Sequence, residues 1–168
     1  MNSKIFDKKL GIIGGGQLGK MLLSECNKMN IYTSVLDPNK NSPCKNLSNK
    51  FYFGDFNDYD TVYNFGKDCD LITFEIEHIN VDALESLEKI GKAIYPKSKT
   101  LRIIQDKNLQ KSFFKKNNIP TSNFEYFKSL DELKKSIEDN KVKFPCVWKK
   151  TKFGYDGFGV KILNSFDD

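Results

Sequence analysis

A glycine-rich segment near the N-terminus lies between a short apolar strand and a helix with regularly spaced apolar residues. The strand is predicted over Leu10–Ile13, and Gly14, Gly16 and Gly19 follow it in a G-x-G-x-x-G arrangement. Glycines at these positions allow a tight turn from strand to helix and leave the helix N-terminus open to an anion. The segment therefore predicts the first unit of an α/β fold, with an anion-binding loop at the end of its strand.

Strands and helices alternate up to about residue 96. Further strands are expected over Ile31–Leu36, Phe51–Phe53, Asp70–Glu75 and Ala93–Tyr95, and helices over Tyr59–Phe65 and Val81–Ile90. This alternation predicts a parallel sheet with helices on both faces, in which ligands bind at the carboxyl ends of the strands. The turn at Gly15–Gln17 and the segment Glu75–His78 should meet at that edge of the sheet.

From residue 99 onward the spacing of apolar residues predicts one longer helix. Apolar residues recur at helical spacing over Lys99–Asn118, and the helix stops before Pro120 because the residue preceding a proline resists the α conformation. A capping box at Ser129–Glu132 opens another helix. We expect two domains, residues 1–98 and 99–168.

A second glycine-rich turn lies between two short strands near the C-terminus, Phe144–Lys149 and Val160–Leu163. Gly154, Gly157 and Gly159 lie in this turn, beside several lysines. Glycine accepts positive φ without a Cβ clash, and backbone N–H groups beside a lysine suit a triphosphate. An ordinary β-hairpin with a loose turn explains the same spacing. A single function has to account for both glycine loops.

Composition argues against several other classes of function. The net charge of +5 comes from 26 lysines and one arginine, which are spread along the chain without the basic and aromatic interleaving of nucleic-acid binding. The four cysteines form no C-x-x-C pair, and Cys26 and Cys69 fall in apolar patterns that predict buried thiols. With no signal peptide and no apolar run long enough to cross a bilayer, we expect a cytoplasmic protein without a nucleic-acid or membrane partner.

Several motifs together resemble one enzyme family. Gly14–Met21 is similar to the opening loop of N5-carboxyaminoimidazole ribonucleotide synthetase, an ATP-grasp enzyme of purine biosynthesis. Further similar motifs follow in the right order: Leu36-Asp37-Pro38 with Pro43, Thr73–Ile79, Gln105-Asp106-Lys107, Asn118–Thr121 and Gly154–Gly159. The resemblance spans nearly the whole chain. It implies a Rossmann-like preATP-grasp domain, followed by the incomplete start of an ATP-grasp domain.

The resemblance also implies a reaction. The family joins bicarbonate to the amine of 5-aminoimidazole ribonucleotide through carboxyphosphate, with ATP and Mg²⁺, and its members often pair as homodimers. Phosphoryl transfer needs positioning and neutralisation of charge more than covalent participation by the protein. Carboxyphosphate is short-lived in water, so a closing glycine flap suits this chemistry.

The resemblance assigns ATP-binding roles to the second part of the chain. Lys107 and Lys149 resemble ligands of the ATP phosphates. The flap over the phosphates is expected at Gly154, Tyr155, Asp156, Gly157, Phe158, Gly159 and Val160. Phe158 departs from the family, which commonly has lysine or arginine there. A second departure is that family members continue beyond this hairpin, and the magnesium ligands are expected in that further part.

Substrate-binding roles fall in the first part of the chain. Gly16, Gln17 and Leu18 resemble the segment that receives the ribonucleotide, and Glu75 resembles a carboxylate that binds ribose hydroxyls. We interpret Asp37 as a turn former before proline. His78, the one histidine, is read as structural, and no catalytic residue or metal ligand is assigned.

Three alternatives stay open. A formate-dependent glycinamide ribonucleotide transformylase has a similar glycine loop, but more typically carries glutamate where Gln17 stands. A nicotinamide-dependent dehydrogenase would use the first glycine loop and Asp37, which leaves the second glycine turn unexplained. An inactive fragment is the third alternative.

Overall fold

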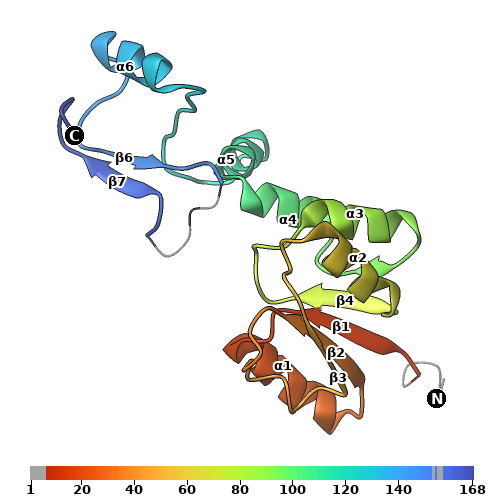
Figure 1. Cartoon of the computed structure of the whole chain (residues 1–168). Coiled ribbons are helices and arrows are strands. Elements are labelled where there is room, and N and C mark those ends of the chain that lie inside the picture. Colours follow the sequence, from red (N-terminus) through yellow and green to blue (C-terminus); the bar gives the residue numbers. More distant parts are fainter. Residues whose placement is uncertain (1–6, 153, 155–156) are drawn as a thin grey trace. The chain divides into compact units, whose positions relative to one another are not determined.

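The computed structural model describes residues 7–152, 154 and 157–168. It divides into two compact units, Met1–Arg102 and Ile103–Asp168. In Figure 1 the first unit runs from red to green and the second from green to blue. Each unit is described by itself below.

The first unit is built on a five-stranded sheet. Its strands are β1 (Lys9–Ile13), β2 (Tyr32–Asp37), β3 (Lys50–Phe53), β4 (Leu71–Phe74) and β5 (Ala93–Ile94). They are ordered β3-β2-β1-β4-β5 and every neighbouring pair is parallel. This confirms the parallel α/β sheet predicted from the alternating pattern. The chain extends the sheet to one side of β1 as far as β3, and then to the other side from β4, so the strand order reverses at β1.

Helices cover both faces of this sheet. Helix α1 (Gln17–Lys28) lies on one side, and α2 (Tyr59–Lys67) and α3 (Val81–Lys89) lie on the other (Figure 1). Asp58 and Asn80 begin the latter two helices by accepting hydrogen bonds from the N–H groups of Thr61 and Ala83. Such caps satisfy N–H groups that have no partner within the helix.

Neighbouring residues of β1 pack into different hydrophobic cores, because successive side chains of a strand point to opposite faces of the sheet. Ile12 packs with Leu23 of α1 and Val35 of β2. Ile13 belongs to the larger core, which includes Val62 of α2 and Leu84 of α3. All six side chains are fully buried. The central strand is therefore apolar on both faces, as a covered parallel sheet requires.

The single long helix predicted over Lys99–Asn118 is wrong. Helix α4 (Ser98–Gln105) ends before Asp106, and α5 (Lys107–Lys116) begins after it. Asp106 has extended backbone angles, φ −120° and ψ 109°, and its carboxylate accepts hydrogen bonds from the N–H groups of Asn108 and Leu109. Aspartate favours this capping role over a helix interior, and it starts a new helix within an unbroken apolar pattern.

The second unit contains α5, α6 (Leu130–Glu138) and an antiparallel hairpin of β6 (Cys146–Lys149) and β7 (Val160–Leu163). Ser129 caps α6 by accepting a hydrogen bond from the N–H of Glu132 at 3.2 Å. This confirms the predicted helix start and the predicted hairpin.

We expect Gly66→Ala to destabilise the first unit. Gly66 lies buried in α2, where an added Cβ would come 2.3 Å from Leu87 Cδ1 and 2.9 Å from Ile72 Cδ1. Both neighbours are fully buried in the core. Overpacking of this kind costs about 1–3 kcal/mol, more than alanine gains in helix propensity.

Urea denaturation measures this loss as a fall in the free energy of unfolding. Asn64→Ala is the matched control, because Asn64 is exposed on the same helix. An equal change in the two variants would contradict the steric explanation.

Candidate functional site

The predicted ribonucleotide loop lies at the carboxyl edge of the sheet, where the strand order reverses. Gly14 follows β1 with φ +98°, a left-handed conformation that favours glycine. Its N–H donates to Leu36 O at 3.0 Å, and the Glu75 N–H donates to Ile13 O at 3.1 Å. These bonds prolong the strand ladders on both sides of β1. They hold the segments after β1, β2 and β4 together, in the crevice where open α/β sheets bind ligands.

Close packing explains why this loop consists of glycines. A Cβ on Gly14 would lie 2.8 Å from Glu75 Oε1, and a Cβ on Gly19 would lie 2.6 Å from Gly14 O. The loop therefore folds against both the segment after β4 and the first turn of α1. A side chain at either position would force these parts away from one another.

Glu75 and the start of α1 meet at this edge, as the sequence predicted. The Gly16 N–H donates to Glu75 Oε1 at 3.2 Å. Gly16 is the residue that begins α1, and no side chain caps the helix there. The first N–H groups of a helix have no partner within it, and its positive end attracts anions. Gln17 and Leu18 are both exposed at this helix start.

Asp37 has a role that sequence reasoning missed. The carboxylate accepts a hydrogen bond from the Asn39 N–H at 2.7 Å, which confirms the predicted turn after β2. Its other oxygen accepts from the Gly15 N–H at 2.6 Å. Asp37 is 8% exposed, so the carboxylate is engaged with the backbone. The signal for this role in the sequence was the position of Asp37, at the end of the strand that neighbours the glycine loop.

A buried thiol lies behind the same loop. Burial, with smaller contributions from Asp37 and Glu75, raises the pKa of Cys44 to about 11. The thiol therefore stays protonated at neutral pH and lies 3.8 Å from Gly16 O, to which it donates. Cys26 and Cys69 are also free and buried, as the apolar patterns predicted.

His78 lies in the segment that follows β4. Its Nε2 is 3.7 Å from Glu77 Oε1, and its side chain is about one-quarter exposed. A structural role for His78 stays a prediction.

In the second unit, Lys107 lies beside the glycine turn. The Lys107 N–H donates to Thr151 O at 2.8 Å, and Lys107 Cε lies 3.8 Å from the position of a Cβ on Gly154. The structure thus brings together two predicted ATP-binding residues from segments far apart in the sequence. Lys152 adds a cation to this turn, 3.8 Å from Asp106 Oδ2.

Lys149 lies at the end of β6, opposite Val160, where the hairpin opens into the glycine turn. The next residue, Lys150, donates its N–H to Gly159 O at 2.8 Å. Gly159 has φ +69°, and the Lys150 side chain packs against it. Lys149 itself is exposed.

The remaining flap residues lie in the glycine turn and at the start of β7. Phe158 is 66% exposed and Val160 is 40% exposed. Gly157 has φ +88°, again a conformation that favours glycine. Tyr155 and Asp156 lie outside the described residues.

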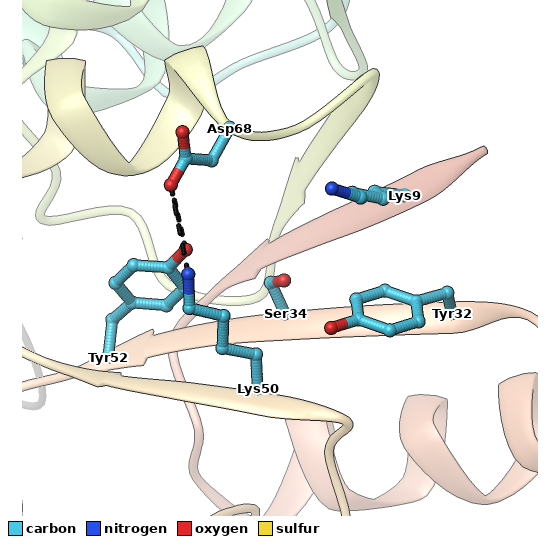
Figure 2. A pocket seen from close by; sticks show the side chains of 6 residues that line it. All are labelled: Lys9, Tyr32, Ser34, Lys50, Tyr52 and Asp68. Carbon is cyan, nitrogen blue, oxygen red and sulfur yellow. Dashed lines mark hydrogen bonds and ion pairs between the residues drawn. The ribbon is translucent and has the colours of Figure 1, made fainter.

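A hollow of about 200 Å³ lies at the opposite, amino edge of the sheet (Figure 2). Its lining residues are Lys9, Tyr32, Ser34, Lys50, Tyr52 and Asp68. Asp68 accepts a hydrogen bond from Tyr52 Oη at 2.9 Å and lies 3.8 Å from Lys50 Nζ. A hydrogen bond with Tyr52, aided by Asp68, raises the pKa of Lys50. Asp68 thus binds Tyr52 and Lys50, and none of the predicted site residues that the structure describes lines the hollow.

Neither a metal-binding cluster nor a membrane-spanning helix is found in the part of the chain that the structure describes. Within residues 7–152, 154 and 157–168, no group of three or more His, Cys, Asp or Glu side chains is arranged to hold a metal ion. No helix in that same part of the chain combines the length and apolar character needed to span a membrane.

Known proteins match both units. Residues 7–105 match the family described as the ribonucleotide synthetase preATP-grasp domain, and residues 112–168 match the ATP-grasp domain. Phosphoribosylaminoimidazole carboxylase, chloroplastic, from Vigna aconitifolia is 37% identical over 164 residues. That alignment covers 98% of this chain and 29% of the relative.

Two solved structures are similar over nearly the whole chain. N5-carboxyaminoimidazole ribonucleotide synthetase from Thermotoga maritima is 40% identical with a TM-score of 0.83, covering 96% of this chain and 42% of that one. N5-carboxyaminoimidazole synthase from Aspergillus clavatus, in complex with ADP and 5-aminoimidazole ribonucleotide, is 34% identical with a TM-score of 0.80. There the alignment covers 95% of this chain and 41% of that one.

The chain thus spans less than half the length of these relatives, within which it aligns with a preATP-grasp domain and the start of an ATP-grasp domain. The resemblance seen in the two glycine loops is confirmed: this chain belongs to the ribonucleotide synthetase preATP-grasp family.

Proposed function

We propose that this chain supplies the ribonucleotide-binding domain and the first part of the ATP-binding domain of an enzyme that carboxylates 5-aminoimidazole ribonucleotide. The contact between Gly16 and Glu75, at the uncapped start of α1, carries the proposal. It combines an anion-attracting helix end with a hydrogen-bonding carboxylate. A similar protein has been solved with this ribonucleotide and ADP bound.

The ribonucleotide would use both groups. Its 5′-phosphate suits the first N–H groups of α1, because that helix end carries partial positive charge. Glu75 would accept hydrogen bonds from ribose hydroxyls. The exposed side chains of Gln17 and Leu18 would contact the same molecule. The start of α1 would thus recognise the phosphate, and the neighbouring Glu75 would recognise the ribose hydroxyls.

ATP would bind at the glycine turn of the second unit. Lys107, held beside Gly154, and Lys149, at the end of β6, would neutralise phosphate charge. The turn from Gly154 to Val160, with Tyr155 and Asp156 in it, would cover the phosphates. Glycines allow the backbone of such a flap to approach a ligand closely.

The proposed reaction has two steps. A bicarbonate oxygen attacks the γ-phosphorus of ATP and the bond to the ADP oxygen breaks, which yields carboxyphosphate. The 5-amino nitrogen of the ribonucleotide then attacks the carboxyl carbon, loses a proton, and inorganic phosphate leaves. The lysines position and neutralise the phosphates, and the flap excludes water that would hydrolyse carboxyphosphate.

Magnesium is the cofactor that the family implies. In proteins, Mg²⁺ is commonly held by one or two carboxylates together with substrate phosphates. The described residues offer no cluster suited to a metal ion, and we propose no magnesium ligand among them. We also propose that the complete enzyme forms a homodimer and is located in the cytoplasm. The free buried thiols support a reducing compartment.

The alternatives receive less support. A dehydrogenase would need Asp37 to hold a ribose, but both oxygens of that carboxylate accept backbone hydrogen bonds. A transformylase would depend on formate, and Gln17 departs from the glutamate typical of that family.

Ligand titration tests the proposal directly. We expect calorimetry to show binding of 5-aminoimidazole ribonucleotide to this chain and no binding of NAD, the control ligand. For the complete enzyme, ADP release should require both this ribonucleotide and bicarbonate. NAD binding without ribonucleotide binding would overturn the proposal, and dependence on formate would indicate the transformylase.

Lys149→Ala should weaken ATP binding about tenfold, because one charge-assisted contact to a phosphate is worth roughly 1.5 kcal/mol. Calorimetric titration of ATP measures the change, with circular dichroism to verify the fold. The matched control is Lys143→Ala, an exposed lysine before the same strand. Unchanged ATP affinity in Lys149→Ala would remove Lys149 from the site.

Gln17→Ala should weaken ribonucleotide binding several-fold, by about 1 kcal/mol for one lost hydrogen bond, and leave ATP binding within about twofold. Parallel titrations with the two ligands measure the difference. Ser24→Ala, an exposed substitution on the same helix, serves as the control. If only ATP affinity fell, the role of the N-terminal loop would be wrong.

A further inference from the structure

We propose that Asp37 and Ser42 are positioning residues that hold Gly15 from both sides and so fix the ribonucleotide loop in its binding conformation. The inference rests on the proposed function for its ligand. Its structural basis is a set of hydrogen bonds between two loops at the carboxyl edge of the sheet.

Asp37 supplies one side of this clamp. Its Oδ2 accepts from the Gly15 N–H at 2.6 Å, while its Oδ1 accepts from the Asn39 N–H at 2.7 Å. The bond to Asn39 closes a local turn of the kind that aspartate side chains commonly form two residues along the chain. The bond to Gly15 crosses to a segment 22 residues away, so local turn formation does not account for it.

Ser42 supplies the other side. Its Oγ donates to Gly15 O at 2.7 Å and accepts from the Cys44 N–H at 3.3 Å. The Ser42 N–H in turn donates to Asn39 O at 3.0 Å. Ser42 is 6% exposed, which shields these bonds from competition with water. Both backbone polar groups of Gly15 are thus held, one by the last residue of β2 and the other by the loop that follows it.

Shape complements these hydrogen bonds. A Cβ on Gly15 would lie 2.3 Å from Ser42 Oγ and 3.1 Å from Val35 Cγ1. The two loops therefore approach so closely that only a residue without a side chain fits. A shift of Gly15 along the loop would break both hydrogen bonds at once.

The clamp acts on the binding residues through the next residue. Gly16 donates its N–H to Glu75 and accepts the Lys20 N–H at its oxygen, the first bond of α1. Holding Gly15 therefore fixes where the helix begins and how its first N–H groups are directed. In the proposal, Asp37 and Ser42 make no contact with the substrate. They set the geometry of the groups that do.

Affinity measurements with paired ligands test the clamp. We expect Asp37→Ala to weaken 5-aminoimidazole ribonucleotide binding about tenfold or more, because it removes a charge-assisted bond to the loop. ATP affinity should change less than about twofold, as the predicted ATP residues lie in the second unit. Asp37→Asn should recover only part of the loss, since its single amide oxygen can accept from Gly15 while its NH2 group cannot accept from the Asn39 N–H.

Asp70→Ala is the matched control. Asp70 also accepts a backbone hydrogen bond from β1, from the Lys9 N–H at 2.9 Å, but at the other end of that strand. Equal losses of ribonucleotide affinity in Asp37→Ala and Asp70→Ala would overturn the proposal, because they would reflect general destabilisation. Full affinity in Asp37→Ala would overturn it as well. If Asp37→Ala does not fold, Ser42→Ala carries the same test with a smaller expected loss, about fivefold, because its hydroxyl makes a neutral hydrogen bond to Gly15.

Amide hydrogen exchange separates failure of the clamp from failure of the proposed function. In ¹⁵N-labelled protein, the Gly15 amide should exchange at least about tenfold faster in Asp37→Ala than in the parent, and should be unchanged in Asp70→Ala. If the parent chain binds no ribonucleotide, the proposed function fails and this readout decides the clamp alone. Unchanged Gly15 exchange in Asp37→Ala would then overturn it.

Discussion

The backbone hydrogen bonds on the two sides of β1 are the constraint on which the rest of the first unit depends. β1 pairs with β2 on one side and with β4 on the other, in parallel register. Both ladders continue one step past the strands, through the N–H groups of Gly14 and Glu75. Because all three strands end at the same edge, the segments that leave them are forced into contact. Gly16 and Glu75 meet for this reason.

That contact imposes steric demands on the loop. Gly14 needs a left-handed conformation, and Gly15 and Gly19 have no room for a side chain. Asp37 would be costly to bury without partners, and the backbone N–H groups of Gly15 and Asn39 supply them. Loop shape and carboxylate burial therefore support one another, and the start of α1 is left without a side-chain cap.

Sequence periodicity and motif spacing predicted much of this arrangement. The alternating strands and helices, the glycine turn after β1 and its meeting with Glu75 followed from local patterns together with the rules of parallel sheets. The break at Asp106 did not, because an apolar pattern on both sides of a cap resembles one continuous helix. The position of Lys107 beside Gly154 followed from resemblance alone, since the two residues are far apart in the chain.

The sequence by itself determined the parallel α/β class, the two glycine loops and the cap at Ser129, because each depends on conformational preferences within a few residues. Only the tertiary structure decided what Asp37 and Ser42 do. Their partner, Gly15, lies 22 and 27 residues away, and its distance depends on how two strands align in the sheet. Local preference makes Asp37 a turn former, and strand register places its carboxylate where it accepts a hydrogen bond from the neighbouring loop.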